Sequence, residues 1–172
     1  MPLRQKLLRI RFYFMKPVTG VKFIFAILIC QAAGLLGTIF TVPAIPTWYA
    51  ALQKPAFALP NWLFAPAWFI LYTLMGITLY RLWIIKGNDP RVKHALKLFF
   101  IQFMLNSLWS FLFFGLRNPL AGFAGILVLE SAIVLTFVFS WKVDRVAALL
   151  LVPYILWVAF ASALNFSILI LN

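Results

Sequence analysis

Residues 119–141 read PLAGFAGILVLESAIVLTFVFSW, an apolar stretch with one charged side chain, Glu130. A helix needs about 20 mostly apolar residues to cross a bilayer, and this stretch reaches that length. Its leading proline is tolerable in the first turn of a helix. The apolar residues are continuous, whereas those in a strand of a membrane barrel would alternate with polar ones. The stretch therefore predicts a membrane-spanning helix over 119–141.

Four more stretches have the same character, and the whole chain is 65% hydrophobic and only 10% charged. Lipid is therefore the expected solvent. The other predicted spans are 21–42, 61–85, 94–114 and 146–171. The first is expected to end before Pro43, because proline cannot continue a helix. Together the spans predict an all-α membrane protein, a bundle of five transmembrane helices.

Lysine and arginine residues fall almost entirely on one side of the predicted bundle. When the spans are followed along the chain, Lys54 and Arg117 are the two that fall on the opposite side. Basic loops favour the cytoplasm, so we expect residues 1–20 to form a basic cytoplasmic segment, followed by a membrane domain over 21–172 whose C-terminus lies across the membrane. A cleavable signal peptide is the alternative for the first span, but its apolar run exceeds the typical length of about 7–15 residues.

Composition disfavours several classes of function. The net charge of +12 lies in short clusters between apolar runs, which argues against nucleic acid as a partner. Cys30 is the one cysteine, so we expect neither a disulfide within the chain nor a cysteine metal cluster, and assign it to packing. The one histidine, His94, lies at a membrane edge among basic residues. We therefore expect no metal site, no haem and no other cofactor.

Aromatic and polar residues recur at helical spacing in three of the spans. Steps of about 3 to 4 residues place side chains in one stripe of a helix. The stripes are Trp68, Tyr72 and Gly76 in the second span, Gln102, Asn106, Trp109 and Phe113 in the third, and Tyr154, Trp157, Ala161 and Asn165 in the fifth. Flat aromatic area with a few amides suits an apolar ligand pocket. The amides could equally join neighbouring helices, and the spacing does not show that the stripes converge.

Two features leave alternatives open. The expected loop over 43–60 contains four prolines with Trp48 and Tyr49, and it either folds over the bundle end or sits at the membrane interface in an aromatic belt. Glu130 is the only acid near the centre of a span, where a charge facing lipid is costly. It is either a working residue or a neutral carboxyl that is hydrogen-bonded within the bundle or across an oligomer contact.

Short motifs along the chain form a recognisable series. They are WYAALQKP at 48–55, PNW at 60–62, PAW at 66–68, NSLW at 106–109, PYILW at 153–157 and LN at 164–165. In this order and spacing they resemble the TspO/MBR family, whose members are also called translocator proteins, tryptophan-rich sensory proteins or peripheral-type benzodiazepine receptors. The resemblance covers residues 34–172.

The resemblance implies a five-helix bundle, often a homodimer, in a bacterial cell membrane. It implies a receptor for porphyrin and other tetrapyrroles, for sterols, and for isoquinoline-type or benzodiazepine ligands. The cavity residues that it implies are Trp68, Asn106, Trp157 and Ala161, and the stripes add Tyr72, Trp109, Tyr154 and Asn165. The residues that it implies for a lid formed by the 43–60 loop are Trp48, Leu52, Lys54 and Pro55.

Three functions therefore compete: a membrane receptor or translocator for flat hydrophobic ligands, a light-dependent porphyrin-degrading protein, and a purely structural membrane protein. For the second, the resemblance points to Trp68 and Trp157 as the reacting tryptophans. The chain also departs from the family pattern. Gly125 stands where bacterial relatives often have an acid, and no Lys or Arg follows Phe166. The second departure means that high-affinity cholesterol binding is not implied.

Overall fold

The computed structural model describes residues 17–85 and 89–172, and this part of the chain contains helices and no strand. Five helices in it are long and apolar enough to cross a membrane: Gly20–Tyr49, Asn61–Trp83, Pro90–Gly115, Pro119–Trp141 and Arg145–Leu171. The expected all-α bundle of five membrane-spanning helices is confirmed. Residues 1–16 of the expected basic segment, and Lys86, Gly87 and Asn88 after the second span, lie outside the described residues.

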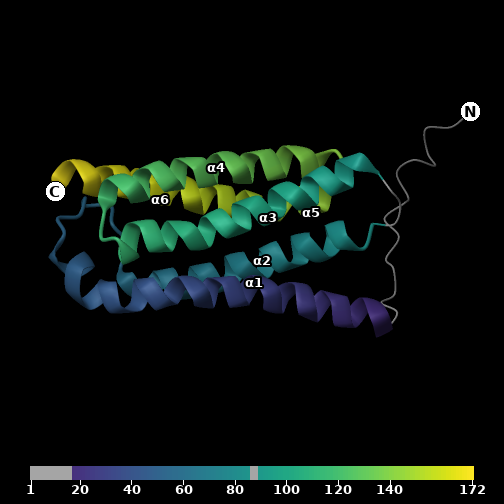
Figure 1. Cartoon of the computed structure of the whole chain (residues 1–172), viewed down its shortest axis with the longest axis horizontal. Helices are drawn as coiled ribbons and strands as arrows, with labels where there is room; N and C mark the ends of the chain where they lie inside the picture. Colours follow the sequence, from purple (N-terminus) through teal and green to yellow (C-terminus); the bar gives the residue numbers. More distant parts are fainter. Residues whose placement is uncertain (1–16, 86–88) are drawn as a thin grey trace, which may run out of the picture.

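The five spans run side by side along one axis, each roughly antiparallel to the next (Figure 1). Their helices are α1 (Pro17–Ala44), α2 (Phe64–Trp83), α3 (Pro90–Ser110), α4 (Pro119–Trp141), and, in succession within the last span, α5 (Arg145–Leu149) and α6 (Val152–Leu171). α1 packs on α2 and α3, and α4 packs on α3 and α6. The largest cluster of buried residues includes Cys30, Met75, Phe99, Leu129 and Tyr154. Cys30 thus lies in the core, as its apolar surroundings in the sequence suggest.

The first helix runs past the end expected at Val42. α1 continues through Pro43 to Ala44 and is followed by the π-helical turn η2 (Ile45–Tyr49). Pro46 provides no N–H for the ladder, and a wider turn accommodates such a gap. The hydroxyl of Thr47 donates to the Pro43 carbonyl at 2.9 Å, one turn back along the chain. The expected 43–60 loop therefore shortens to a link over 52–60, and Trp48 and Tyr49 lie on the helix.

Local capping sets the other helix ends. α3 begins at Pro90 instead of the expected His94, because Asp89 accepts a hydrogen bond from the Arg91 backbone N–H at 2.9 Å. Hydrogen bonds from the Arg91 side chain also lower the pKa of the Asp89 carboxyl below its ordinary value. α3 ends in a second π-helical turn, η4 (Phe111–Gly115), and α2 is preceded by the 3₁₀ turn η3 (Asn61–Leu63). α4 has the expected bounds.

The last span is broken where one helix over 146–171 was expected. α5 ends at Leu149 and α6 begins at Val152, because Pro153 cannot donate to the carbonyl of Leu149. Leu151 donates instead to the Ala148 carbonyl at 2.9 Å. The two pieces still form one span.

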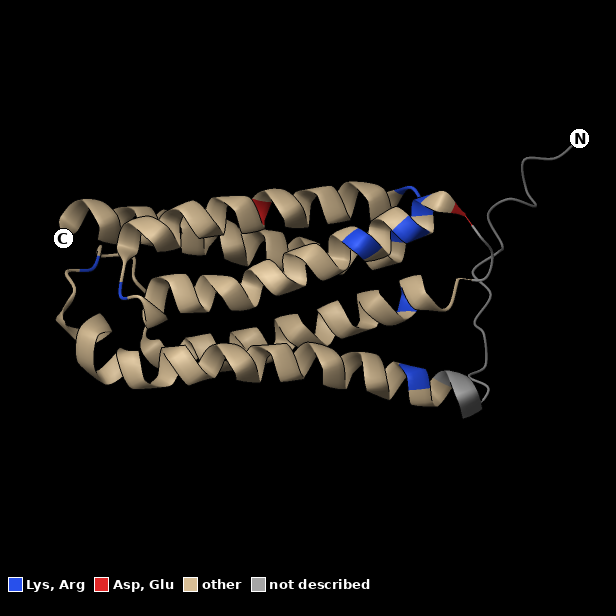
Figure 2. Cartoon of the chain, viewed as in Figure 1, with Lys and Arg blue, Asp and Glu red and all other residues tan. Residues whose placement is uncertain are grey.

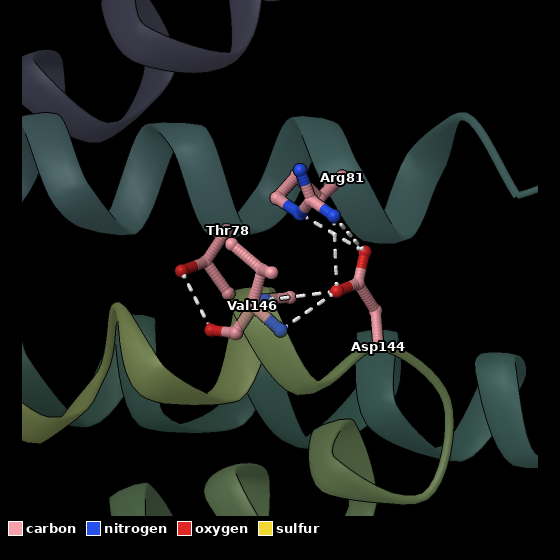
Figure 3. A network of polar contacts seen from close by, with 5 residues as sticks. Thr78, Arg81, Asp144 and Val146 are labelled. Carbon is pink, nitrogen blue, oxygen red and sulfur yellow. Dashed lines mark hydrogen bonds and ion pairs between the residues drawn. The ribbon is translucent and has the colours of Figure 1, made fainter. Parts of the chain in front are cut away.

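A polar network fastens α5 to α2 (Figure 3). Arg81 Nη2 lies 2.8 Å from a carboxylate oxygen of Asp144, and its Nε donates to the same carboxylate at 2.9 Å. Asp144 also caps α5 by accepting from the backbone N–H of Val146 at 2.9 Å. Thr78 donates to the carbonyl of Ala147 at 3.1 Å. The carboxylate of Asp144 therefore caps the first turn of α5 and also binds α2 through Arg81.

The two ends of the bundle differ in charge (Figure 2). Lys54 and Arg117 lie at the end that carries the C-terminus, and the other described lysines and arginines lie toward the opposite end, with Asp89 and Asp144. Which end faces the cytoplasm stays a prediction.

Candidate functional site

A cavity of about 350 Å³ lies within the half of the bundle that carries the C-terminus. Its walls come from four of the spans: α1 with η2, η3 with α2, α3 with η4, and α6. Its volume lies near the lower end of the roughly 300–1,000 Å³ range of small-molecule pockets. The wall is mostly apolar and aromatic, which is the usual character of such pockets.

The three stripes converge on this cavity. Seven of the twelve residues that the sequence nominates line it: Trp68, Tyr72, Asn106, Trp109, Trp157, Ala161 and Asn165. Three other stripe residues, Gly76, Gln102 and Tyr154, do not belong to the wall. Gly76 faces α1, where a side chain would collide with the backbone of Ile27, and Gln102 is fully buried in the core. Gln102 therefore differs in role from Asn106 and Asn165, which line the cavity, although helical spacing places all three in the stripes.

Asn106 holds three helices together at the cavity wall. The hydroxyl of Tyr72 on α2 donates to Asn106 Oδ1 at 2.5 Å, and Asn106 Nδ2 donates to the hydroxyl of Tyr154 on α6 at 2.8 Å. All three residues are buried. Tyr154 does not line the cavity, and its hydroxyl accepts the hydrogen bond of Asn106 on the side away from the cavity. A buried hydrogen-bonded network of this kind fixes the position of the wall.

Three polar atoms of the wall are buried and have no hydrogen-bond partner among the described residues. They are the indole Nε1 atoms of Trp109 and Trp157 and the amide oxygen of Asn165. The amide nitrogen of Asn165 donates to the Ala161 carbonyl at 3.3 Å. An unpaired buried donor or acceptor costs about 1–3 kcal/mol. Two donors and one acceptor on residues of the wall therefore have no hydrogen bond within the described bundle.

Flat aromatic surfaces make up much of the rest of the wall. The rings of Trp68 and Tyr72 stack, with centroids 5.4 Å apart and planes 28° apart. Trp109 and Phe113 stack with centroids 5.7 Å apart and planes 11° apart. Phe64 meets Trp157 edge to face. Such a wall suits a flat, largely apolar ligand.

The four residues expected to shape a lid lie outside the cavity wall and cover the end of the bundle. Trp48 meets Phe113 edge to face with centroids 5.3 Å apart, and Leu52 packs in the same cluster. Lys54 Nζ lies 4.6 Å from the ring centroid of Tyr49, which does line the cavity. The carbonyl of Pro55 accepts from the Ala58 N–H in a tight turn.

The 52–60 link is also fastened to the chain end, a contact that spacing could not reveal. The backbone N–H of Gln53 donates to Asn172 Oδ1 at 3.0 Å, and Asn172 Nδ2 donates back to the Gln53 carbonyl at 3.1 Å. These two hydrogen bonds join the 52–60 link to the end of α6, and the choice between the two alternatives for the expected loop stays a prediction.

Sequence reasoning missed the contribution of α1. Gln31, Gly34, Leu35 and Thr38 line the cavity, and a side chain at Gly34 would collide with the ring of Tyr72. Gln31 was the available signal, because it is a lone amide inside an apolar span. Glu130 lies outside the cavity wall and is half-buried, and its Oε2 has no partner among the described residues.

Comparisons with known proteins agree with this architecture. The sequence model of the TspO/MBR family matches residues 26–171. The tryptophan-rich protein TspO of Archaeoglobus fulgidus is 51% identical over 154 residues, which cover 88% of this chain and 97% of the relative. The translocator protein of Homo sapiens is 36% identical over 122 residues, which cover 70% of this chain and 72% of the relative. A match of this extent shows that the chain belongs to the TspO/MBR family.

Proposed function

We propose that this protein is a membrane receptor or translocator that binds a porphyrin or another flat hydrophobic ligand in the cavity. The observation that carries the proposal is the convergence of Trp68, Trp109 and Trp157 on one cavity in which two indole N–H groups lack a partner among the described residues. The indole faces would contact the macrocycle. The free N–H groups would donate to carboxylates at its edge. Sterols and isoquinoline-type molecules are the other ligands to test.

Titration with protoporphyrin IX, followed by the absorption band of the porphyrin, tests this proposal. Trp68→Phe combined with Trp157→Phe removes aromatic area and two indole N–H donors from the wall, so we expect Kd to rise about tenfold, which corresponds to 1.4 kcal/mol. The matched control combines Trp62→Phe with Trp83→Phe, because both tryptophans are exposed and neither lines the cavity. Equal affinities of the two double variants would rule out this cavity. Absence of saturable binding for any of the three ligand classes would favour a purely structural protein.

Light-dependent porphyrin degradation is the second candidate, and one observation favours it. Trp68 lies in the cavity wall and stacks on Tyr72, whose hydroxyl is hydrogen-bonded to Asn106. Such a stack would pass an electron to a photoexcited porphyrin, dioxygen would add to the resulting porphyrin radical and oxidise the ring, and the electron would return to the oxidised tryptophan. Illumination of the complex in air should then bleach the porphyrin faster than free tryptophan in detergent does, and Trp68→Phe should remove the difference. Bleaching at the rate seen with free tryptophan would exclude this activity.

The orientation and the oligomeric state belong to the same proposal. We place the end with Lys54 and Arg117 on the non-cytoplasmic side of a bacterial cell membrane, because the described basic residues gather at the other end. Large apolar residues exposed on α3 and α4, such as Leu108 and Leu127, are compatible with a homodimer in the bilayer. Crosslinking in native membranes tests the dimer.

A further inference from the structure

The walls of the cavity differ sharply in exposure. On α3, η4 and α6 the wall is closed, since Asn106 and Phe113 are 2% exposed and Asn165 is 3% exposed. On α1 and α2, wall residues are exposed to the outside of the bundle: Leu35 is 68% exposed and Phe69 is 63% exposed. A residue that lines a cavity and is also mostly exposed marks an opening. The cavity therefore opens sideways, between α1 and α2.

The limits of this opening can be read from the contacts between the two helices. Gln31 Nε2 on α1 donates to the Phe69 carbonyl and to the Thr73 hydroxyl on α2, each at 3.0 Å. Further toward the basic end, Gly76 lets α2 approach the backbone of Ile27, so closely that a side chain there would collide with it. The seam is thus closed from Gln31 toward the basic end and open from Leu35 onward.

The surroundings of the opening are apolar. Leu36, Ile39 and Ile70 are large apolar residues, each more than half exposed. In a membrane such a surface meets acyl chains. The bundle end is covered instead by the 52–60 link, which is fastened by the Gln53–Asn172 pair. The side route into the cavity therefore meets lipid, whereas the 52–60 link lies at the end of the bundle (Figure 1).

We propose that ligand is exchanged between the cavity and the hydrocarbon of the bilayer through the α1–α2 opening, and that Gln31 limits the width of this opening. The inference rests on the proposed function, because it requires a ligand that dissolves in lipid. A ligand that partitions into the membrane reaches the opening without crossing the link. If the orientation proposed above holds, exchange occurs with the non-cytoplasmic leaflet.

Blocking groups at the opening test the route. In a Cys30→Ala background, Leu35→Cys or Phe69→Cys is labelled in detergent with a bulky maleimide and then reconstituted into vesicles. Leu36→Cys and Ile70→Cys are matched controls, since Leu36 and Ile70 are 58% and 57% exposed and do not line the cavity. Protoporphyrin association and dissociation are followed by stopped-flow tryptophan quenching. We expect labels at 35 and 69 to slow both rates about tenfold, and labels at 36 and 70 to leave both rates unchanged.

The outcomes separate the route from the proposed function. Any of three results would overturn the route. The rates could stay at wild-type values with labels at 35 and 69, or slow equally with labels at all four positions. The third result is a weaker Kd with an unchanged association rate. An unlabelled protein without saturable porphyrin binding would overturn the proposed function, and the route with it. Asn172→Ala, which releases the link, should leave the rates from vesicles unchanged. A tenfold acceleration in that variant would show that ligand passes beneath the link instead.

The role of Gln31 is tested by its removal. Gln31→Leu breaks both bonds to α2 and should raise the association and dissociation rates of protoporphyrin together by about threefold. Ser131→Ala is the control, because Ser131 does not line the cavity and donates within its own helix, to the Leu127 carbonyl. Unchanged rates in Gln31→Leu, or the same change in both variants, would show that Gln31 does not limit the opening.

Discussion

The side chain of Asn106 uses both ends of its amide within the bundle. Its oxygen accepts from Tyr72 and its nitrogen donates to Tyr154, so one residue of α3 is joined to α2 and α6. At 2% exposure Asn106 has no access to bulk water that could replace either bond. Replacing it therefore leaves two hydroxyl groups to be satisfied, at about 1–3 kcal/mol for each that stays unpaired.

Asn106→Leu should consequently destabilise the protein by at least about 2 kcal/mol, whereas Tyr72→Phe, which removes one bond, should cost about 1 kcal/mol. Unfolding in mixed micelles with increasing SDS measures both free energies. Ser107→Ala serves as the control, since the Ser107 hydroxyl has no partner among the described residues, and it should change little. If Asn106→Leu and Ser107→Ala had equal free energies of unfolding, the Tyr72–Asn106–Tyr154 network would contribute nothing to stability.

Helical spacing identifies residues on a common face but not their partners. It grouped Trp68 with Tyr72, Asn106 with Trp109, and Trp157 with Asn165, and all six line the cavity. It could not separate Asn106 from Gln102, because the two lie one turn apart and differ only in depth. Gln31 was missed because α1 carries no aromatic stripe to mark it. The contact between Gln53 and Asn172 joins residues far apart in the sequence, so no local pattern indicates it.

Proline changes the course of two elements in different ways. In α1 the helix passes Pro43 and widens into η2, which carries Tyr49 to the cavity. In the last span Pro153 separates α5 from α6. The sequence predicts a helix end before Pro43 and an unbroken helix through Pro153, and the structure shows the reverse in both places. A hydroxyl at Thr47 supports continuation in the first case.

Asp144 should be the most important helix cap of the basic end, because it starts α5 and also pairs with Arg81. Asp144→Ala should lower the free energy of unfolding by about 1–2 kcal/mol, through loss of a cap and of a half-buried ion pair. Asp144→Asn keeps an acceptor for the cap and removes the charge, so its loss should be smaller. Unfolding by SDS titration of the two variants separates the contribution of the helix cap from that of the ion pair. Equal losses in both variants would assign the whole effect to the ion pair.

At the scale of the whole molecule, the solvent determines what the sequence can predict. Lipid requires long apolar helices with satisfied backbone groups, so the number of spans follows from length and hydropathy. Helix neighbours are less predictable, because apolar residues cover both the lipid-facing and the buried sides. Leu28 and Leu36 are exposed, whereas Leu71 and Leu79 are buried. Burial therefore has to come from the structure.

The difference in charge between the two ends predicts how the bundle sits in the membrane. A basic end held in the cytoplasm leaves the 52–60 link and Arg117 on the other side. Ala56→Cys and Arg117→Cys, in a Cys30→Ala background, should react in intact cells with a maleimide that cannot cross membranes. Lys93→Cys and Lys142→Cys, which are exposed at the basic end, should react only after permeabilisation. The reverse pattern would invert the proposed topology and place the opening between α1 and α2 in the cytoplasmic leaflet, where it would take ligand from inside the cell.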